Sequence, residues 1–135
     1  MKLKTIAATV CAMFACGCVS TSTGGFEVSV GEGDPAATLK IDDLSFAERF
    51  SVETAGVRRE PSGFISAQVR LRNRQGQDAS IQYKFAFFSG DGMEIQPDAR
   101  PWEQTTIHGG ETVSLSAVAP DKSAVRFVVR IRRAM

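Results

Sequence analysis

Few residues in this chain of 135 could perform acid–base or nucleophilic chemistry. The only histidine is His108, so a polyhistidine metal site is excluded, and an acid–base pair would need this one imidazole or none. The three cysteines all lie within the first 18 residues, and no Gly-x-Ser-x-Gly motif is present. The residue types therefore predict a protein that is not an enzyme and that uses neither a metal nor another cofactor.

The cysteines lie at the end of a segment organised like a secretion signal. Lys2 and Lys4 precede about ten apolar residues, which is within the ~7–15 of a signal-peptide core and short of the ~20 needed to span a bilayer. Small residues and cysteine follow, and then a tract of Ser, Thr and Gly. This arrangement resembles a bacterial lipoprotein signal, which implies cleavage before a cysteine that carries the lipid.

Two cysteines compete for that lipid. Cleavage before Cys18 leaves a mature chain with no other thiol, whereas cleavage before Cys16 leaves Cys18 unpaired in an oxidising compartment. We therefore predict a signal peptide of residues 1–17 and acylation of Cys18, with Cys16 as the alternative. A plain signal-peptidase cut or an uncleaved anchor is the other interpretation. Val19 stands where inner-membrane lipoproteins of enteric bacteria carry aspartate, so the resemblance implies the outer membrane of a Gram-negative bacterium, facing the periplasm.

Composition and charge indicate one neutral globular domain. Hydrophobic residues make up 43% and charged residues 23%, which is typical of a globular protein. The formal net charge is +1, which argues against nucleic acid as a partner. Residues 18–38 are rich in Ser, Thr and Gly and predict a flexible tether, with a possible short strand at 26–30. A tether of this length would hold the domain ~25 Å from the membrane on average.

From residue 39 to 135 the apolar residues alternate with a period of two. This period predicts an all-β fold, an antiparallel immunoglobulin-like β-sandwich of about six or seven strands. Strands at 64–73 and 79–88, separated by turn residues, are expected to form a hairpin, and a further strand is expected around 45–54. The inward residues of the second strand should pack against those of the first and of the last strand: Ile81, Tyr83, Phe85 and Phe87 against Val69, Leu71, Phe127 and Val129.

The second half of the chain also resembles a known family. It contains a strand of the form Tyr-x-Phe-x-Phe-Phe at 83–88, an Asp-Gly turn at 91–92, a Trp shortly after, a Gly-Gly turn at 109–110, an Ala-Pro at 119–120 and a closing strand ending in arginine. Residues 39–133 with these features are similar to the YcfL-like putative periplasmic lipoproteins. The resemblance implies a small all-β lipoprotein without an established activity. It also implies a link, by gene neighbourhood in enteric relatives, to a lipoprotein activator of peptidoglycan synthesis.

Basic side chains form the candidate interaction surface. They project from the polar sides of three expected strands, and they would form one cationic face if those strands were neighbours: Arg70, Arg72, Arg126, Arg130, Arg132 and Lys84. Alternatively, they pair with acidic residues such as Glu48, Glu53 and Glu111 and keep the sheet soluble. Trp102 would either pack at the core or its rim, or offer a ring on which a ligand stacks.

These observations predict a lipid-anchored, noncatalytic binding module of the cell envelope. Its partner would be an envelope protein or peptidoglycan, and its oligomeric state is left open. The alternative function is that of a hydrolase or transferase accessory enzyme acting on the cell wall. That alternative would require a pocket that brings His108 together with a carboxylate and a serine.

Overall fold

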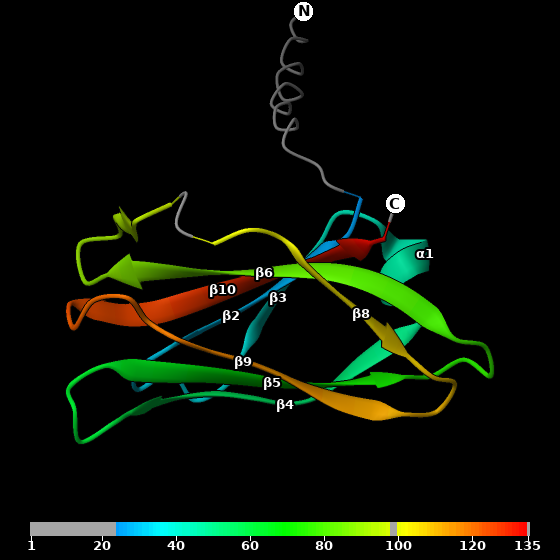
Figure 1. Cartoon of the computed structure of the whole chain (residues 1–135), viewed down its shortest axis with the longest axis horizontal. Coiled ribbons are helices and arrows are strands. Elements are labelled where there is room, and N and C mark those ends of the chain that lie inside the picture. The colour runs from blue at the N-terminus through cyan, green and yellow to red at the C-terminus, as the bar shows by residue number, and fades with distance from the viewer. Residues whose placement is uncertain (1–23, 98–99, 135) are drawn as a thin grey trace, which may run out of the picture.

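The computed structural model describes residues 24–97 and 100–134, which form two stacked antiparallel sheets (Figure 1). The large sheet has the order β3 (Thr38–Ile41), β2 (Phe26–Gly31), β10 (Ala124–Arg133), β6 (Ala79–Ser89) and β7 (Glu94–Ile95), and β8 (Glu103–Ile107) also pairs with β6. The small sheet has the order β4 (Phe50–Arg59), β5 (Ile65–Asn73) and β9 (Thr112–Val118). The prediction of an antiparallel β-sandwich is confirmed.

The core lies between the two sheets and consists of the residues that alternate inward along each strand. Phe85 and Phe87 of β6 are buried, as are Phe127 and Val129 of β10. From the small sheet, Val69 and Leu71 are fully buried, and Ile81 lies among these residues. Tyr83 is half-buried, because its hydroxyl group points to Glu103 at 3.4 Å. The predicted inward face is therefore confirmed, which fixes the register of the strands.

The expected hairpin between residues 64–73 and 79–88 is wrong. The two segments are β5 and β6, which belong to different sheets, so the turn between them crosses from one layer to the other. Both strands present an apolar face to the same core, and they satisfy their backbone groups with other partners. β5 pairs with β4 and β9, and β6 pairs with β10, β7 and β8.

The strand expected around 45–54 is also wrong in its first half. A short helix, α1 (Leu44–Ala47), precedes β4, which begins at Phe50. The helix begins where Asp43 accepts a hydrogen bond from the backbone N–H of Phe46 at 3.1 Å. Phe46 is buried against Phe26 and Phe50, with ring centroids 5.9 and 5.1 Å away.

Of the tether expected at 18–38, the structure describes residues 24–38, and these are not a free linker. The strand predicted at 26–30 is present as β2, but it lies inside the large sheet between β3 and β10. Residues 24–38 are therefore part of the sandwich. The predicted signal peptide and both candidate lipidation sites, Cys16 and Cys18, lie outside the described residues. Within the described residues, no helix has the length and apolar character needed to cross a membrane.

Candidate interaction surfaces

His108 lies in the turn between β8 and β9 and is exposed. Its Nδ1 lies 3.2 Å from a carboxylate oxygen of Asp78, and its backbone N–H donates to Glu111 at 2.8 Å. Neither of the two hollows described below is lined by His108. Within residues 24–97 and 100–134, no group of His, Cys, Asp and Glu is arranged to hold a metal ion.

The expected arginine surface is divided between the two outer faces of the sandwich. Arg70 and Arg72 belong to β5 of the small sheet, whereas Arg126, Arg130 and Arg132 belong to β10 of the large sheet. Lys84 of β6 is the cross-strand neighbour of Arg130. The prediction of a single cationic face is therefore wrong, because the expected hairpin that would have placed β5 beside β6 does not form.

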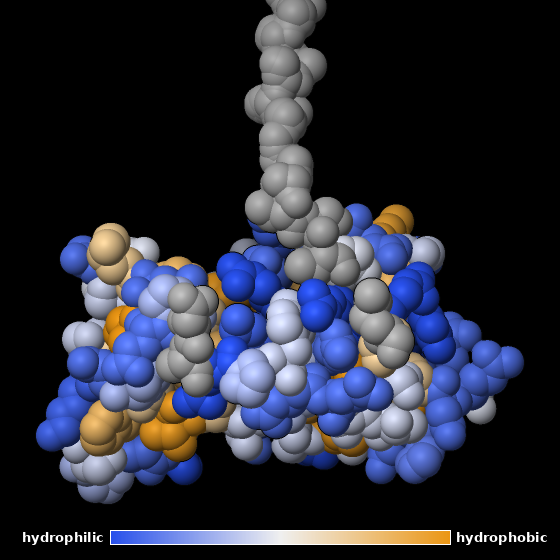
Figure 2. Space-filling model, turned by 45° about the horizontal axis from the view of Figure 1, so that its top comes forward, coloured by the Kyte–Doolittle hydropathy of each residue, from blue (hydrophilic) through white to orange (hydrophobic). Residues whose placement is uncertain are grey.

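The arginines of the large sheet are paired. Arg126 contacts Asp34 at 2.9 Å and Ser29 at 2.8 Å, and Arg130 contacts Glu27 at 3.0 Å. Both carboxylates come from the segment that the sequence indicated as a tether, so these pairs could not be foreseen. Among the described residues, Glu48, Glu53 and Glu111 form no ion pair with an arginine. Figure 2, turned so that the large-sheet side comes forward, shows mainly hydrophilic residues.

Trp102 lies on the large-sheet side rather than in the core. It is half-buried, and the guanidinium carbon of Arg132 lies 3.7 Å from the centre of its ring. Arg132 also donates to the side chain of Gln82 at 2.9 Å, which fixes the guanidinium over the indole. One face of the ring is therefore already covered, which reduces its use as a stacking platform.

Arg70 and Arg72 on the small sheet have different surroundings. Their cross-strand neighbours on β9 are Ser114 and Thr112, which carry no charge. Both arginines are exposed, and within the described residues neither forms an ion pair or a hydrogen bond through its side chain.

A hollow of about 640 Å³ lies on this same face beyond Arg70, and we call it the small-sheet hollow. Its floor consists of short side chains from all three strands, which is why the surface is depressed there. Gly56 and Ser116 flank Gln68 in the same cross-strand row, and Ser66 lies one row further along. Arg58 and Glu60, an ion pair at 3.1 Å, also line the small-sheet hollow.

A second hollow lies between the edge strands β3 and β4, and we call it the α1 groove. Its volume is about 220 Å³, and its lining is mainly apolar: Phe26, Leu39, Ile41, Leu44, Ala47, Phe50 and Val52, with Glu48, Ser51 and Arg74. Sequence analysis did not find the α1 groove, because it depends on β3 being an edge strand.

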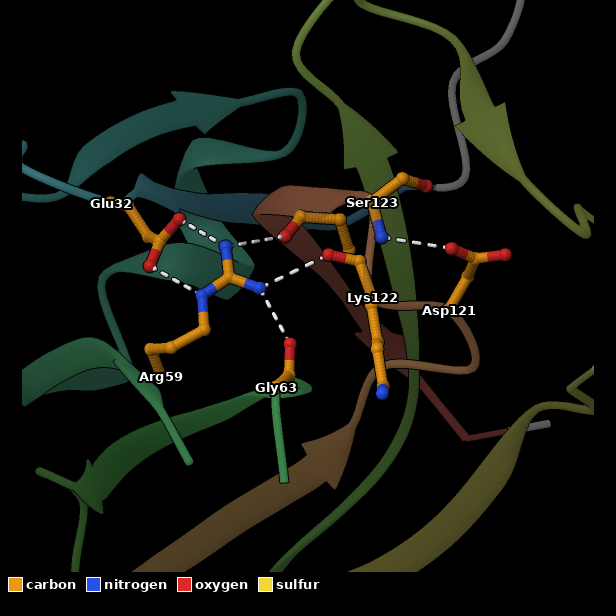
Figure 3. Close-up of polar contacts among 7 residues, drawn as sticks. Glu32, Arg59, Gly63, Asp121, Lys122 and Ser123 are labelled. Atoms are coloured by element: carbon orange, nitrogen blue, oxygen red, sulfur yellow. Dashed lines mark hydrogen bonds and ion pairs between the residues drawn. The ribbon is translucent and has the colours of Figure 1, made fainter. Parts of the chain in front are cut away.

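Arg59 is the last residue of β4, at the end of that strand away from α1, and it joins the two sheets (Figure 3). Its guanidinium binds both carboxylate oxygens of Glu32, and it donates to the backbone carbonyls of Gly63, Lys122 and Ala124. Hydrogen bonding to Arg59 lowers the pKa of the Glu32 carboxyl below its ordinary 4.5. The contact therefore ties the ends of β2 and β4 to two turns. Sequence analysis did not single out Arg59, because its four partners come from three separate segments.

The chain belongs to the DUF1425 family, described as a protein of unknown function, whose model matches residues 37–133. A solved member of this family from Shewanella sp. pv-4 is 24% identical, with a TM-score of 0.58 over 84% of this chain and 94% of that chain. The Campylobacter jejuni protein cj0090 is 22% identical, with a TM-score of 0.54 over 62% of this chain and 85% of that chain. At these identities the likeness is one of fold. No curated protein matches the chain.

Proposed function

We propose that the protein is a noncatalytic binding module of the bacterial cell envelope, anchored to the outer membrane through a lipid on Cys18 and facing the periplasm. The signal-like N-terminus supports the anchor, and membership of the DUF1425 family is compatible with the resemblance to YcfL-like periplasmic lipoproteins. Peptidoglycan or an envelope protein engaged in cell-wall assembly is the class of partner that this resemblance favours.

The observation that carries the proposal is the pair of unpaired arginines beside the small-sheet hollow. Within the described residues Arg70 and Arg72 are exposed cations of one strand without a carboxylate partner, whereas Arg58, Arg126 and Arg130 have carboxylate partners at 2.9 to 3.1 Å. A concave surface with two exposed positive charges next to it on the same face fits an anionic segment of a partner, since Arg binds carboxylate and phosphate groups in a bidentate manner. We infer that the outer face of the small sheet is the binding face.

Photo-crosslinking in intact envelopes tests this face. A crosslinking amino acid at Gln68, on the floor of the small-sheet hollow, should capture a partner, whereas the same residue at Lys84 on the opposite outer face should not. Combining the Gln68 probe with Arg70→Gln and Arg72→Gln should lower capture about two- to thirtyfold, because each exposed charge contact is worth ~0.2–1 kcal/mol. Capture should also fall as salt rises, because charges are screened over ~8 Å at ~0.15 M.

The matched control is the double change Arg126→Gln and Arg130→Gln, which removes the same charge from the other face. Capture that is insensitive to the first pair, or equally sensitive to both pairs, would contradict a binding face on the small sheet. Release of soluble fragments from purified peptidoglycan by the protein alone would favour the alternative, an accessory enzyme.

A further inference from the structure

The α1 groove exists because the two sheets differ in width at one side. Leu39 and Ile41 of β3 are the cross-strand partners of Val28 and Phe26, so they face the same side of the large sheet as the core. The small sheet ends at β4 and does not cover them. Leu39 is 52% exposed and Ile41 is 46% exposed, whereas Val28 and Phe26 are buried. Leu44 of α1 is 59% exposed at the same place.

The opposite side of the sandwich is covered. There Arg100 donates to the backbone carbonyl of Val118 on β9, and its guanidinium carbon lies 5.5 Å from the ring centre of Phe87. This contact bridges the two sheets, and the core behind it has little exposed apolar surface: Phe87 is 1% exposed. Of the five large apolar side chains that are exposed among the described residues, three lie together at β3 and α1: Leu39, Ile41 and Leu44.

The chain enters the fold at the α1 groove. The backbone carbonyl of Gly25 accepts hydrogen bonds from the N–H groups of Asp42 and Asp43 at 2.9 and 3.0 Å, which lie between β3 and α1. Gly25 also packs directly on β10, since an added Cβ atom would lie 1.8 Å from the carbonyl oxygen of Ile131. The next residue, Phe26, lines the α1 groove. The point of entry is thus fixed against both neighbouring segments.

The distance from a lipid on Cys18 to this entry point is short. Five residues lie between Cys18 and Gly24, and the six steps from one Cα atom to the other span at most about 20 Å in a fully extended chain. A flexible segment of six residues averages about 13 Å. The α1 groove would therefore stay at the level of the membrane surface, and the turns at the Arg59 end would point away from it.

We propose that the α1 end of the sandwich faces the bilayer and that Leu39, Ile41 and Leu44 insert into the lipid interface. This inference rests on the proposed lipid anchor on Cys18. Charges around the α1 groove nearly balance, with exposed Lys40 and Arg74 and half-buried Arg49 against exposed Asp42 and Glu48. Insertion would therefore depend on apolar contact rather than on attraction to anionic lipid, and zwitterionic vesicles suffice as the membrane.

A site-specific fluorescent probe tests the inference in the full, acylated protein. Processing before Cys18 removes Cys11 and Cys16, and the lipid occupies the Cys18 thiol, so an introduced cysteine is the free thiol of the mature chain. The changes Leu39→Cys and Leu44→Cys are labelled with a polarity-sensitive dye, and the protein is reconstituted in phosphatidylcholine vesicles. Val118→Cys is the matched control, since Val118 is also 52% exposed but lies on the small sheet beside Ser66, far from the α1 end. Wild-type protein labelled in parallel gives the background.

We expect blue-shifted emission at positions 39 and 44, quenched by bromine-labelled lipid chains, and water-like emission at position 118. Acylated protein with water-like emission at 39 and 44 would overturn the inference and leave the proposed anchor intact. A blue shift that lipid quenchers do not affect would also overturn it, in favour of a second copy of the chain covering the α1 groove. Acyl labelling is measured first, and its absence would overturn the anchor and the inference together.

Discussion

The role of each arginine depends on the residue that lies beside it across the sheet. Arg130 is the cross-strand partner of Glu27, and the two side chains meet at 3.0 Å. Such pairs stabilise a sheet by ~0.2–1 kcal/mol. Arg70 occupies an equivalent outward position, but Ser114 is its partner on β9 and Thr54 on β4. The alternation of residues in the sequence predicts the outward direction of both arginines, and only the strand pairing shows which of them is free.

Phe85 gives the sharpest test of the inward face. It is 5% exposed, and its ring lies 5.7 Å from that of Phe127 between the sheets. Phe85→Ala should lower the free energy of unfolding by ~3–5 kcal/mol, through lost burial and the cavity left behind. Chemical denaturation measures this change. Phe88→Ala is the control from the same strand, since Phe88 points outward and should cost far less. A slip of one residue would exchange the two results.

Asn73 is a buried polar residue that the sequence presents as part of a turn. It continues the inward series Ile65, Ala67, Val69 and Leu71, and it is fully buried. Its side-chain N–H groups donate to the backbone carbonyls of Gln77 and Ile107 at 2.7 and 2.9 Å, and its oxygen accepts from the N–H of Gln75. The Asn73 side chain thus holds the connection between β5 and β6 in place through these hydrogen bonds. The signal in the sequence for a buried Asn73 is that this polar residue continues the alternation of the inward apolar residues.

Asn73→Asp should be destabilising, because a carboxylate cannot donate to the two carbonyl oxygens that it would face. Leaving buried polar groups without partners costs ~1–3 kcal/mol, and more for a charged group. We expect a loss of at least this size in urea denaturation at neutral pH. Gln77→Glu makes the same chemical change at an exposed position of the same turn and should have little effect. Equal stability of the two variants would contradict the role assigned to Asn73.

At the scale of elements, the sequence predicts strands and their faces better than their partners. The segments at 64–73 and 79–88 are strands with the expected inward residues, yet they lie in different sheets. A turn of polar residues can connect two strands within a sheet or across a sandwich, and alternation is the same in both cases. The sequence predicts β2 as a short strand within a tether, and not as a member of the sheet, because Gly31 to Gly33 at its end have the composition of a linker.

Arg59 connects the end of β4 to Glu32 after β2 and to the turns that precede β5 and β10. Arg59→Ala removes the bonds to Glu32, Gly63, Lys122 and Ala124 together, so it should lower the melting temperature clearly. Arg58→Ala is the matched control, because the adjacent arginine is more exposed and its side chain contacts only Glu60 within the described residues. Similar melting temperatures for both variants would show that the Arg59 contacts contribute no more than a surface ion pair.

The pH dependence of stability tests the contact between Arg59 and Glu32 through the ionisation of the Glu32 carboxyl group. Hydrogen bonding to Arg59 lowers the pKa of Glu32 in the folded protein, so the stabilisation is present above the unfolded value of 4.5 and is lost as pH falls through the folded value. Thermal unfolding of wild type and Glu32→Gln should therefore differ at neutral pH and converge as pH falls below 4.5 and through the lowered pKa of Glu32 in the folded protein. A difference that stays constant through this range would contradict the assignment.

At the scale of the whole molecule, the proposed anchor and the start of the fold together determine how far the domain can lie from the membrane. The sequence predicts the anchor from charge, apolar length and cysteine spacing, and it predicts a long tether after it. In the structure residues 24–38 are part of the fold, because β2 and β3 are built into the large sheet. A binding face on the small sheet would then work within a short distance of the membrane, so the anchor limits which partners the protein can reach.

The last prediction concerns that anchor. Cys18→Ala should abolish acyl labelling and move the protein from the membrane fraction to the soluble fraction, since an acyl chain contributes ~0.8 kcal/mol per buried methylene group. Within the described residues no helix is long and apolar enough to replace that anchor. Cys16→Ala is the matched control, with the same substitution two residues earlier. Loss of labelling in the control alone would move the lipid to Cys16, which would leave Cys18 as a free thiol. Unchanged labelling and membrane association in both variants would contradict a lipid anchor at either cysteine.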